Sequence, residues 1–413
     1  MEKENMVKVL PGGLRFAFKK STSPVAYCAL SIRCGTAMEP EEYGGLSHFA
    51  EHMIFKGTEK RTATSINNRL ERLGGELNAF TSKEEIVVYS TILKEDLPKA
   101  IDLIFEIVFT SKFDEKEIAK ERQVVIDEIN LYKDSPSDYI FDDFEEFLFK
   151  GYPLSRSVLG KSSSLKKITS ATLKDYTSGC FVPCNMTLGV VGDFDCEAVA
   201  KLSEKLLAKY AKMSGDGQEK IEPKYGFPCS TVFTKDCHKK NHQSNCIIGA
   251  EAYSVRDPRK IALLLLTNIL GGPSSNSVLN TVLRERNALV YNVEAVYTQY
   301  LTTGVALFYF GCEKHNVDKC IELILKELER FRTVLLSERA LKSAKKQMLG
   351  QLAISSDNGE AQALAISKSI MTNDKYLSDD EIRQKVEAVT AEDILSCAND
   401  IFASDKISML IYR

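Results

Sequence analysis

The chain carries an internal repeat, and this feature constrains its fold more than any other. Residues 168–191 align without a gap with residues 389–412, and the apolar positions coincide although few identities remain. Upstream, residues 113–129 align in the same way with residues 336–352. Self-similarity over such lengths indicates two copies of one structural unit. Residues 213–227, rich in Gly, Pro and charge, are typical of a linker between them.

Each half mixes strands and helices in runs, which predicts an α+β fold with helices packed on one face of a sheet. We expect two homologous domains, residues 1–212 and 228–413, joined by the linker. In the first half, apolar spacing and turn residues predict strands within 7–18 and at 25–33, 76–81 and 86–93, and helices at 64–73, 97–108 and 113–134.

Composition narrows the class of protein. A chain of 413 residues is long enough for two cores, and 44% hydrophobic with 27% charged residues is typical of a soluble globular protein. A net charge of -3 gives no reason to expect nucleic acid or a membrane surface as a partner. Eleven Cys without paired spacing favour free thiols in a reducing compartment. The first residues contain no signal-peptide pattern and no apolar run is long enough to span a membrane, so we expect a cytoplasmic protein.

Residues 44–55, GGLSHFAEHMIF, contain the motif most able to carry chemistry. His48, Glu51 and His52 stand in the order H-x-x-E-H, and helical spacing would place all three side chains on one face. Two His and a third protein ligand form a catalytic zinc site that leaves one position for water, with the Glu beside that water. The alternative is a solvated helix with two His and a Glu, which predicts no third ligand elsewhere.

The segment 113–134 offers candidates for the third ligand. It has the acidic first turn and apolar spacing of a helix, and it contains Glu121 and Glu128. These residues are two helical turns apart, so both carboxylates project from the same side. One could bind the metal while the other orients a ligand or the water. The alternative is an ordinary charged helix face.

Together with the His pair, this segment makes the chain resemble the pitrilysin or insulinase family of zinc metallopeptidases, M16. The resemblance is to the short members, which include bacterial proteins and the subunits of the mitochondrial processing peptidase. It extends to GGELNAFTS at 74–82, YPLSRSVLG at 152–160 and LGGPSSNSVLNTVLRERNALVY at 270–291. It therefore covers nearly the whole chain.

The resemblance implies a fold and a set of roles. Each domain would be a mostly antiparallel sheet with helices on one face, and the two would form half of a clamshell. His48, His52 and Glu128 would bind Zn²⁺, Glu51 would be the general base, and Glu121 would orient the site without binding the metal. The family uses the strand at 76–81 as an exposed edge where substrate backbone pairs, so Asn78, Ala79 and Phe80 are candidate substrate contacts, the alternative being a plain sheet edge.

The second copy of the repeat lacks the residues that would bind the metal. Glu121 aligns with Ala344 and Glu128 with Gln351, and the counterpart of the metal helix, 261–270, has Asn268 as its one ligand-type residue.

Arg284 and Tyr291 match a pair that the family brings opposite the metal helix, where both could stabilise an oxyanion. From the residues alone, a surface Arg and a core Tyr is the simpler interpretation. Asn287 and Ala288 stand where Arg-Gly is common in the family.

One further run deserves comparison with a metal site. Cys237, His238, His242 and Cys246 lie within CHKKNHQSNC. The run lacks standard paired spacing and continues into CIIGA, so we interpret it as the start of a strand and not as a second metal site.

We therefore predict a zinc endopeptidase that hydrolyses short or unfolded peptides. The resemblance implies a homodimer, or a heterodimer with a related chain. One alternative is a scaffolding member of the same fold, which the complete motif set argues against. Others are a peptide-binding module with little or no turnover and a processing peptidase for targeting sequences.

Overall fold

The computed structural model describes residues 5–211, 226, 230–239 and 242–413. They divide into two compact units, each built around one sheet. Unit 1 consists of Met1–Ile129, Arg156–Lys224 and Ile354–Tyr376, and unit 2 of Asn130–Ser155, Tyr225–Ala353 and Leu377–Arg413. Apart from Gly226, the predicted linker at 213–227 lies outside the described residues.

The sheet of unit 1 has six strands among the described residues. In spatial order they are β1 (Asn5–Val9), β2 (Arg15–Lys20), β6 (Met186–Gly192), β3 (Val25–Ile32), β5 (Ile86–Leu93) and β4 (Glu76–Thr81). All neighbours are antiparallel except β2 and β6. The strands predicted at 76–81 and 86–93 have the observed bounds, and β4 is an edge strand.

The sheet of unit 2 has five strands in the part of the chain that is described. Their order is β7 (Thr234–Cys237), β11 (Ser408–Tyr412), β8 (Ser244–Ala252), β10 (Gly304–Cys312) and β9 (Val290–Gln299). Only the pair β11 and β7 is parallel within these described strands. Two mostly antiparallel sheets with helices confirm the α+β fold class.

Both halves of the repeat contribute helices. The first half contributes α1 (Leu46–Ile54), α2 (Ala63–Glu71), α3 (Leu97–Thr110), α4 (Glu115–Lys133), α5 (Pro136–Leu148), α6 (Ser162–Leu165), α7 (Ser170–Cys180) and α8 (Cys196–Tyr210). The second contributes α9 (Lys260–Gly271), α10 (Val317–Thr333), α11 (Glu338–Ser355), α12 (Gly359–Asn373), α13 (Asp379–Ala388) and α14 (Ala391–Ile401). Within the described ranges, no helix is both long and apolar enough to cross a bilayer.

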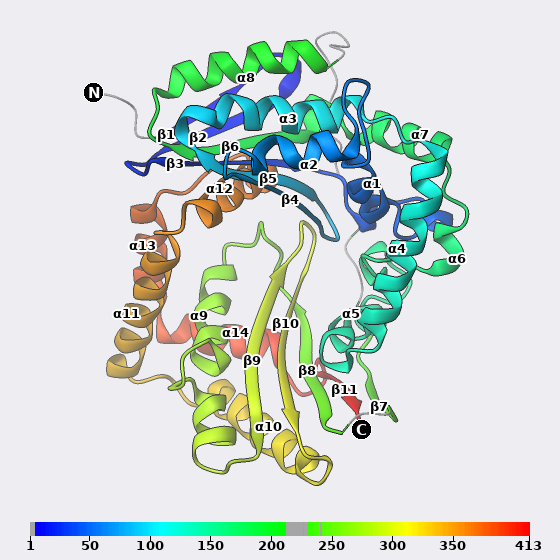
Figure 1. Cartoon of the computed structure of the whole chain (residues 1–413). Helices are drawn as coiled ribbons and strands as arrows, with labels where there is room; N and C mark the ends of the chain where they lie inside the picture. The colour runs from blue at the N-terminus through cyan, green and yellow to red at the C-terminus, as the bar shows by residue number, and fades with distance from the viewer. Residues whose placement is uncertain (1–4, 212–225, 227–229, 240–241) are drawn as a thin grey trace. The chain divides into compact units, whose positions relative to one another are not determined.

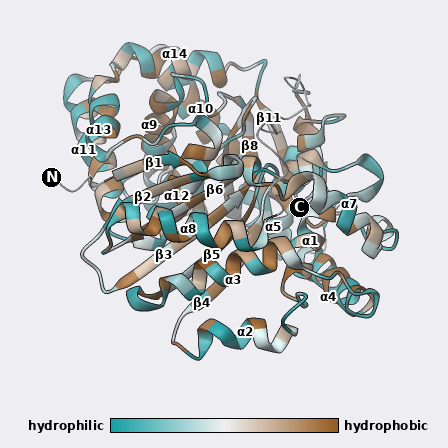
Figure 2. Ribbon diagram, turned by 90° about the horizontal axis from the view of Figure 1, so that it is seen from above, coloured by the Kyte–Doolittle hydropathy of each residue, from teal (hydrophilic) through white to brown (hydrophobic). Residues whose placement is uncertain are grey.

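The main core of unit 1 lies between its sheet and the helices α3 and α8. Side chains alternate along a strand, so Phe16 and Phe18 of β2 point into this core while Ala17 points to the opposite face. Helix α3 is apolar along most of its length and packs against β3, β5 and α8. Figure 2 shows the apolar colour along α3 and the central strands.

The opposite face of the same sheet is covered by α12, a helix from the second half of the chain (Figure 1). Ala363, Ile366 and Ile370 pack there against Ala17 and Val191. The hydroxyls of Ser31 and Ser367 add a buried hydrogen bond of 2.9 Å. The sequence predicted helices on one face of the sheet only, whereas α12 adds a layer on the opposite face.

Unit 2 receives the reciprocal helix. Helix α5 comes from the first half and packs against β8 and β11, with Phe141 and Tyr309 at a ring-centroid distance of 5.2 Å. Since α4 aligns with α11, the helices that follow them, α5 and α12, occupy equivalent places in the repeat. Each half thus contributes one helix to the other half's sheet. The compact units are therefore not contiguous in the chain, since α5 belongs to unit 2 and α12 to unit 1. This packing leaves no local pattern in the sequence, which predicts the contiguous domains 1–212 and 228–413.

Candidate metal centre

The helix that carries His48, Glu51 and His52 begins at a close contact between glycines. Gly45 precedes α1 with φ +90°, a conformation that side chains other than Gly rarely adopt. A Cβ at Gly45 would lie 2.7 Å from the carbonyl oxygen of Leu159 and 3.0 Å from Cα of Gly160. The Gly-Gly pair before the motif and Gly160 therefore let two backbones approach and fix the start of α1.

Glu39 replaces the missing side-chain cap of this helix. Its two carboxylate oxygens accept hydrogen bonds from the backbone N–H groups of Gly45 (2.8 Å) and Ser47 (2.5 Å). An acidic group suits a helix N-terminus, where unpaired N–H groups and the helix dipole favour negative charge. Burial nevertheless raises the pKa of Glu39 to about 7, against the lowering effect of these hydrogen bonds. Glu39 thus orients the metal helix without touching the metal group.

The two His side chains of α1 lie together on one face, as the four-residue spacing predicts. Their ring centroids are 4.6 Å apart with an interplanar angle of 65°. His48 is buried, whereas His52 is partly exposed. One face of α1 therefore presents two imidazoles beside each other.

Glu128 of α4 completes a group of three possible metal ligands. One ligand atom from each of His48, His52 and Glu128 lies within 4.8 Å of the others. The carboxylate is 3.8 Å from Nε2 of His48 and 3.6 Å from Nε2 of His52. These distances are longer than hydrogen bonds, but two ligands of one tetrahedral zinc ion stand roughly 3.4 Å apart. Two nitrogens and one carboxylate are also the donors of a catalytic zinc site, so this group fits the metal.

The environment keeps His48 in the form that binds a metal. Burial, with a smaller contribution from the neighbouring His52, lowers the pKa of His48 to about 3. The imidazole is therefore neutral at neutral pH, with an unprotonated nitrogen available. Its Nδ1 is buried and has no hydrogen-bond partner among the described residues.

Glu121, two turns before Glu128, binds the other nitrogen of His52. The Nδ1 atom of His52 lies 2.9 Å from Oε1 of Glu121, and Lys56 Nζ lies 2.6 Å from Oε2. Burial raises the pKa of Glu121, but the hydrogen bonds from His52 and Lys56 outweigh it and lower the pKa overall. Since an ionised carboxylate accepts the Nδ1 proton, Nε2 of His52 remains free to face Glu128.

The pKa of His52 is raised in this surrounding. Burial lowers it, but the hydrogen bond to Glu121 and the charges of Glu51, Glu121 and Glu128 have the larger combined effect. A divalent cation at Nε2 would exclude a proton from that atom, so metal binding would lower the pKa of His52.

Glu51 lies near this group, where its charge interacts with His52 and Glu128, and a residue of the neighbouring sheet holds its carboxylate. Thr81, the last residue of β4, donates a hydrogen bond from Oγ1 to Glu51 Oε2 over 2.7 Å. Burial raises the pKa of Glu51, and the charge of Glu128 raises it further. The hydrogen bond from Thr81 and the nearby His52 offset part of this increase. The carboxyl group is therefore a more basic acceptor of a proton than an exposed Glu.

The three predicted substrate contacts lie on β4 but do not share a face. Asn78 and Phe80 are exposed, and Ala79 between them packs against the core. Phe80 forms an edge contact with Tyr89 at 6.1 Å. Only β5 pairs with β4 among the described strands, so the other backbone edge of β4 is open. A ligand strand could use this edge.

Arg284 and Tyr291 lie in unit 2, whereas the metal group lies in unit 1. Arg284 is exposed at the end of a π-helix, Asn280–Glu285. Tyr291 on β9 is 58% exposed and donates a hydrogen bond to Glu313 Oε1 over 3.0 Å. Tyr291 is therefore not a core residue, in contrast to the simpler interpretation of the sequence. Between them, Ala288 has φ +49°, a conformation that favours the Gly common at this position in the family.

The run CHKKNHQSNC does not form a metal group in the described part of the chain. Cys237 ends β7, Cys246 lies within β8, and His238 and His242 are exposed. The described residues contain one candidate metal group, that of α1 and α4. The prediction of a strand entering at this run is confirmed by β8.

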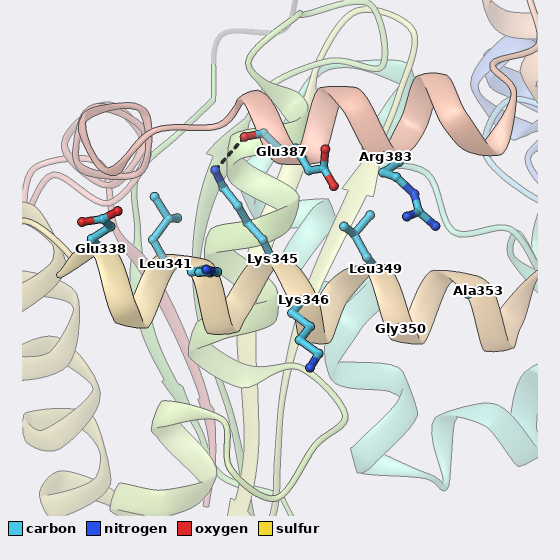
Figure 3. A pocket seen from close by; sticks show the side chains of 10 residues that line it. Glu338, Leu341, Lys345, Lys346, Leu349, Gly350, Ala353, Arg383 and Glu387 are labelled. Carbon is cyan, nitrogen blue, oxygen red and sulfur yellow. Dashed lines mark hydrogen bonds between the residues drawn. The ribbon is translucent and has the colours of Figure 1, made fainter.

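A groove of about 700 Å³ lies elsewhere, between α11 and α13 of unit 2 (Figure 3). Leu341 and Leu349 form apolar parts of its lining, and Lys342, Lys345, Lys346 and Arg383 contribute positive charge. The Lys345 side chain donates a hydrogen bond to the backbone carbonyl of Glu387 at the end of α13. The groove contains no His or Cys, so it lacks the chemistry of the metal group.

Three residues that support the site were not predicted from the sequence. Lys56 lies two positions after the last residue of α1, and a basic residue at a helix C-terminus is a signal that could have indicated it. Glu39 and Thr81 reach α1 through contacts that no periodic pattern announces.

Comparison with known families and proteins gives a consistent result. The family model described as "Insulinase (Peptidase family M16)" matches residues 15–162. A second model, described as "Peptidase M16 inactive domain", matches residues 167–348. The matched stretches place the metal group in the first and Arg284 and Tyr291 in the second.

Similar proteins include both bacterial and mitochondrial members. The chain is 30% identical over 381 residues to the uncharacterized zinc protease YmxG of Bacillus subtilis, covering 92% of this chain and 91% of that protein. It is 30% identical over 417 residues to mitochondrial-processing peptidase subunit beta of Saccharomyces cerevisiae, covering 97% and 89%. A solved protease from Helicobacter pylori shares the fold, with a TM-score of 0.90, 19% identity and 100% of both chains covered.

Proposed function

The chain belongs to the insulinase family of peptidases, M16, and from that premise we propose that it is a zinc-dependent endopeptidase for short or unfolded peptides. The observation that carries the proposal is the convergence of His48, His52 and Glu128 within 4.8 Å beside the buried carboxylate of Glu51. The relatives named zinc proteases support zinc as the metal.

His48, His52 and Glu128 would hold the ion through Nε2, Nε2 and a carboxylate oxygen. Zinc in such a site polarises a carbonyl and lowers the pKa of water toward about 7. Glu121 and Lys56 keep the His52 ring in the orientation and tautomer that this binding needs. The ligands thus come from two helices that Glu39 and Glu121 hold in place.

Glu51 is the general base in this proposal. Its carboxylate accepts a proton from the attacking water and returns it to the leaving amine. The raised pKa of Glu51 suits both transfers, because a stronger base accepts the first proton and a weak acid still delivers the second.

The open edge of β4 would receive the substrate as an added strand. Successive residues of an antiparallel strand direct their backbone groups alternately to its two edges, so within residues 78–80 only alternate residues present N–H and C=O groups to the open edge. Such pairing selects extended and unfolded peptides over folded proteins. Backbone pairing is independent of side chains, so this edge supplies binding and little sequence preference.

Arg284 and Tyr291 would stabilise the oxyanion that forms from the scissile carbonyl. Subunit beta of the processing peptidase is by its name one subunit of an assembly, which supports a dimer here too, either of identical chains or with a related chain. In a dimer the pair could serve the metal group of the partner. The unpaired state of the described cysteines supports a reducing, cytoplasmic location.

The test of the enzyme proposal is cleavage of an unstructured, internally quenched peptide library by the purified chain. We expect turnover that a chelator abolishes and that added zinc restores. Glu128→Gln should lose both zinc and turnover. Bound zinc with no cleavage of any peptide would overturn the endopeptidase and favour a peptide-binding module.

Sharing of the site across a dimer has its own test. Arg284→Ala and Glu51→Gln chains, each inactive alone, are mixed and assayed. Recovered turnover is expected if one chain supplies the base and the other the Arg. Absence of recovery, with dimers of both chains demonstrated, would contradict sharing.

A further inference from the structure

Glu51 is buried on α1, and its carboxylate needs a partner there because burying a polar group without a hydrogen bond is costly. The partner lies on another element: the Thr81 hydroxyl donates to Oε2 over 2.7 Å. No described residue donates a hydrogen bond to Oε1 of Glu51. The two carboxylate oxygens are therefore in different surroundings, one fixed by Thr81 and one available for a proton.

The strand places Thr81 for this contact. Along β4 the side chains alternate between an exposed row, Glu76, Asn78 and Phe80, and a partly buried row, Leu77, Ala79 and Thr81. Leu77 and Ala79 pack against the core. Thr81 continues that row at the end of the strand, where β4 contacts α1, and there its hydroxyl meets a carboxylate.

The backbone of Thr81 also belongs to the edge that is expected to bind substrate. Thr81 pairs with Ile86 of β5, so its position is fixed by the sheet ladder and not by a mobile loop. One residue thus connects the substrate-binding strand with Glu51.

We propose that Thr81 is the positioning residue of the general base: its hydroxyl selects Oε2 of Glu51 as the anchored oxygen and keeps Oε1 directed toward the water beside the metal group. This inference rests on the proposed function. The Thr81 hydroxyl does not contact the reacting atoms in this proposal, because it acts through Glu51. Loss of the hydroxyl should therefore lower kcat and leave zinc binding and KM unchanged.

The chain offers a matched control on the neighbouring strand. Thr91 of β5 donates from Oγ1 to Oε2 of Glu360 over 2.8 Å in the same sheet, and neither residue belongs to the candidate metal group. Thr81→Val and Thr91→Val each remove one Thr–Glu hydrogen bond and keep the side-chain shape. Thr81→Ser restores the hydroxyl.

The experiment compares kcat, KM and zinc content for the three variants and determines crystal structures of Thr81→Val and Thr81→Ser. We expect Thr81→Val to lower kcat by about 10- to 100-fold, the scale of a misplaced reacting group. Thr81→Ser and Thr91→Val should stay within about threefold of the unmodified chain. In the crystals, the Glu51 carboxylate should change conformation in Thr81→Val alone.

A kcat for Thr81→Val equal to that of Thr91→Val, or a Thr81→Ser variant as slow as Thr81→Val, would overturn the proposal. If the unmodified chain cleaves nothing, the enzyme proposal fails by itself. The Glu51 conformation then decides the role of Thr81, and an unchanged carboxylate in Thr81→Val would overturn it.

Discussion

His52 and Glu121 are joined by a hydrogen bond of 2.9 Å between Nδ1 and Oε1. The bond fixes the tautomer of His52, because a carboxylate oxygen can only accept and the proton must lie on Nδ1. Lys56 pairs with the second oxygen at 2.6 Å and keeps Glu121 ionised. The His52 nitrogen that faces Glu128, and that would bind the proposed metal, is thus determined by Glu121 and Lys56, which lie outside the candidate metal group.

Glu121→Gln tests this relationship. The amide is a weaker acceptor and its NH₂ group cannot accept the Nδ1 proton, so the His52 ring loses its fixed orientation. We expect zinc affinity to fall by about 10- to 100-fold, the usual cost of removing such a supporting group. Competition with a chromogenic chelator measures the change.

Glu117→Gln is the matched control on the same helix. Glu117 pairs with Lys120 at the surface of α4 and contacts none of the ligands. Its substitution should leave zinc affinity unchanged. Equal affinities for the Glu121→Gln and Glu117→Gln variants would contradict the role of Glu121.

Glu39→Ala removes the cap of the metal helix. The N–H groups of Gly45 and Ser47 lose their acceptors in a buried site, which costs about 1 to 3 kcal/mol for each unsatisfied group. We expect the free energy of unfolding to fall by about 3 kcal/mol in urea titration. Glu42→Ala, an exposed change in the 3-10 helix Glu41–Tyr43, should stay within about 0.5 kcal/mol. Equal stability of the two variants would show that Glu39 does not hold α1.

Ala288→Gly should stabilise the chain. Ala288 adopts φ +49°, where an L side chain costs about 1 to 2 kcal/mol relative to Gly. The greater freedom of Gly in the unfolded chain offsets part of the gain, so we expect a net increase of about 0.5 kcal/mol. Ala365→Gly, at an exposed position inside α12, should lower the free energy of unfolding by about 1 kcal/mol. Destabilisation by Ala288→Gly would contradict the backbone strain.

Local spacing allowed much of the site to be predicted. Two His at four residues and two Glu at seven residues share helix faces for geometric reasons, so α1 and α4 could be placed from the sequence. The bounds of β4 and β5 followed from apolar alternation and the preceding Gly-Gly. The second half could be recognised as a repeat without the metal site because Ala344 and Gln351 stand where the first half has Glu121 and Glu128.

Contacts between distant parts of the chain could not be predicted in this way. Thr81 reaches Glu51 across 30 positions, and Glu39 caps α1 from outside the helix. A single hydroxyl or carboxylate that forms a hydrogen bond with a residue distant in the sequence is not part of any periodic pattern, so the sequence does not indicate it. The exchange of α5 and α12 is similar, because the apolar residues of a helix do not specify which sheet the helix packs against.

The proposed role of Glu51 is to transfer the proton in a zinc-dependent hydrolysis. The most direct measurement is kcat for cleavage of one quenched peptide by Glu51→Gln, with zinc content determined on the same sample and Glu42→Gln as the exposed control. We expect Glu51→Gln to keep its zinc and to lose about 10²- to 10⁴-fold in kcat, while Glu42→Gln is unchanged. A zinc-loaded Glu51→Gln variant that turns over as fast as the control would contradict this role.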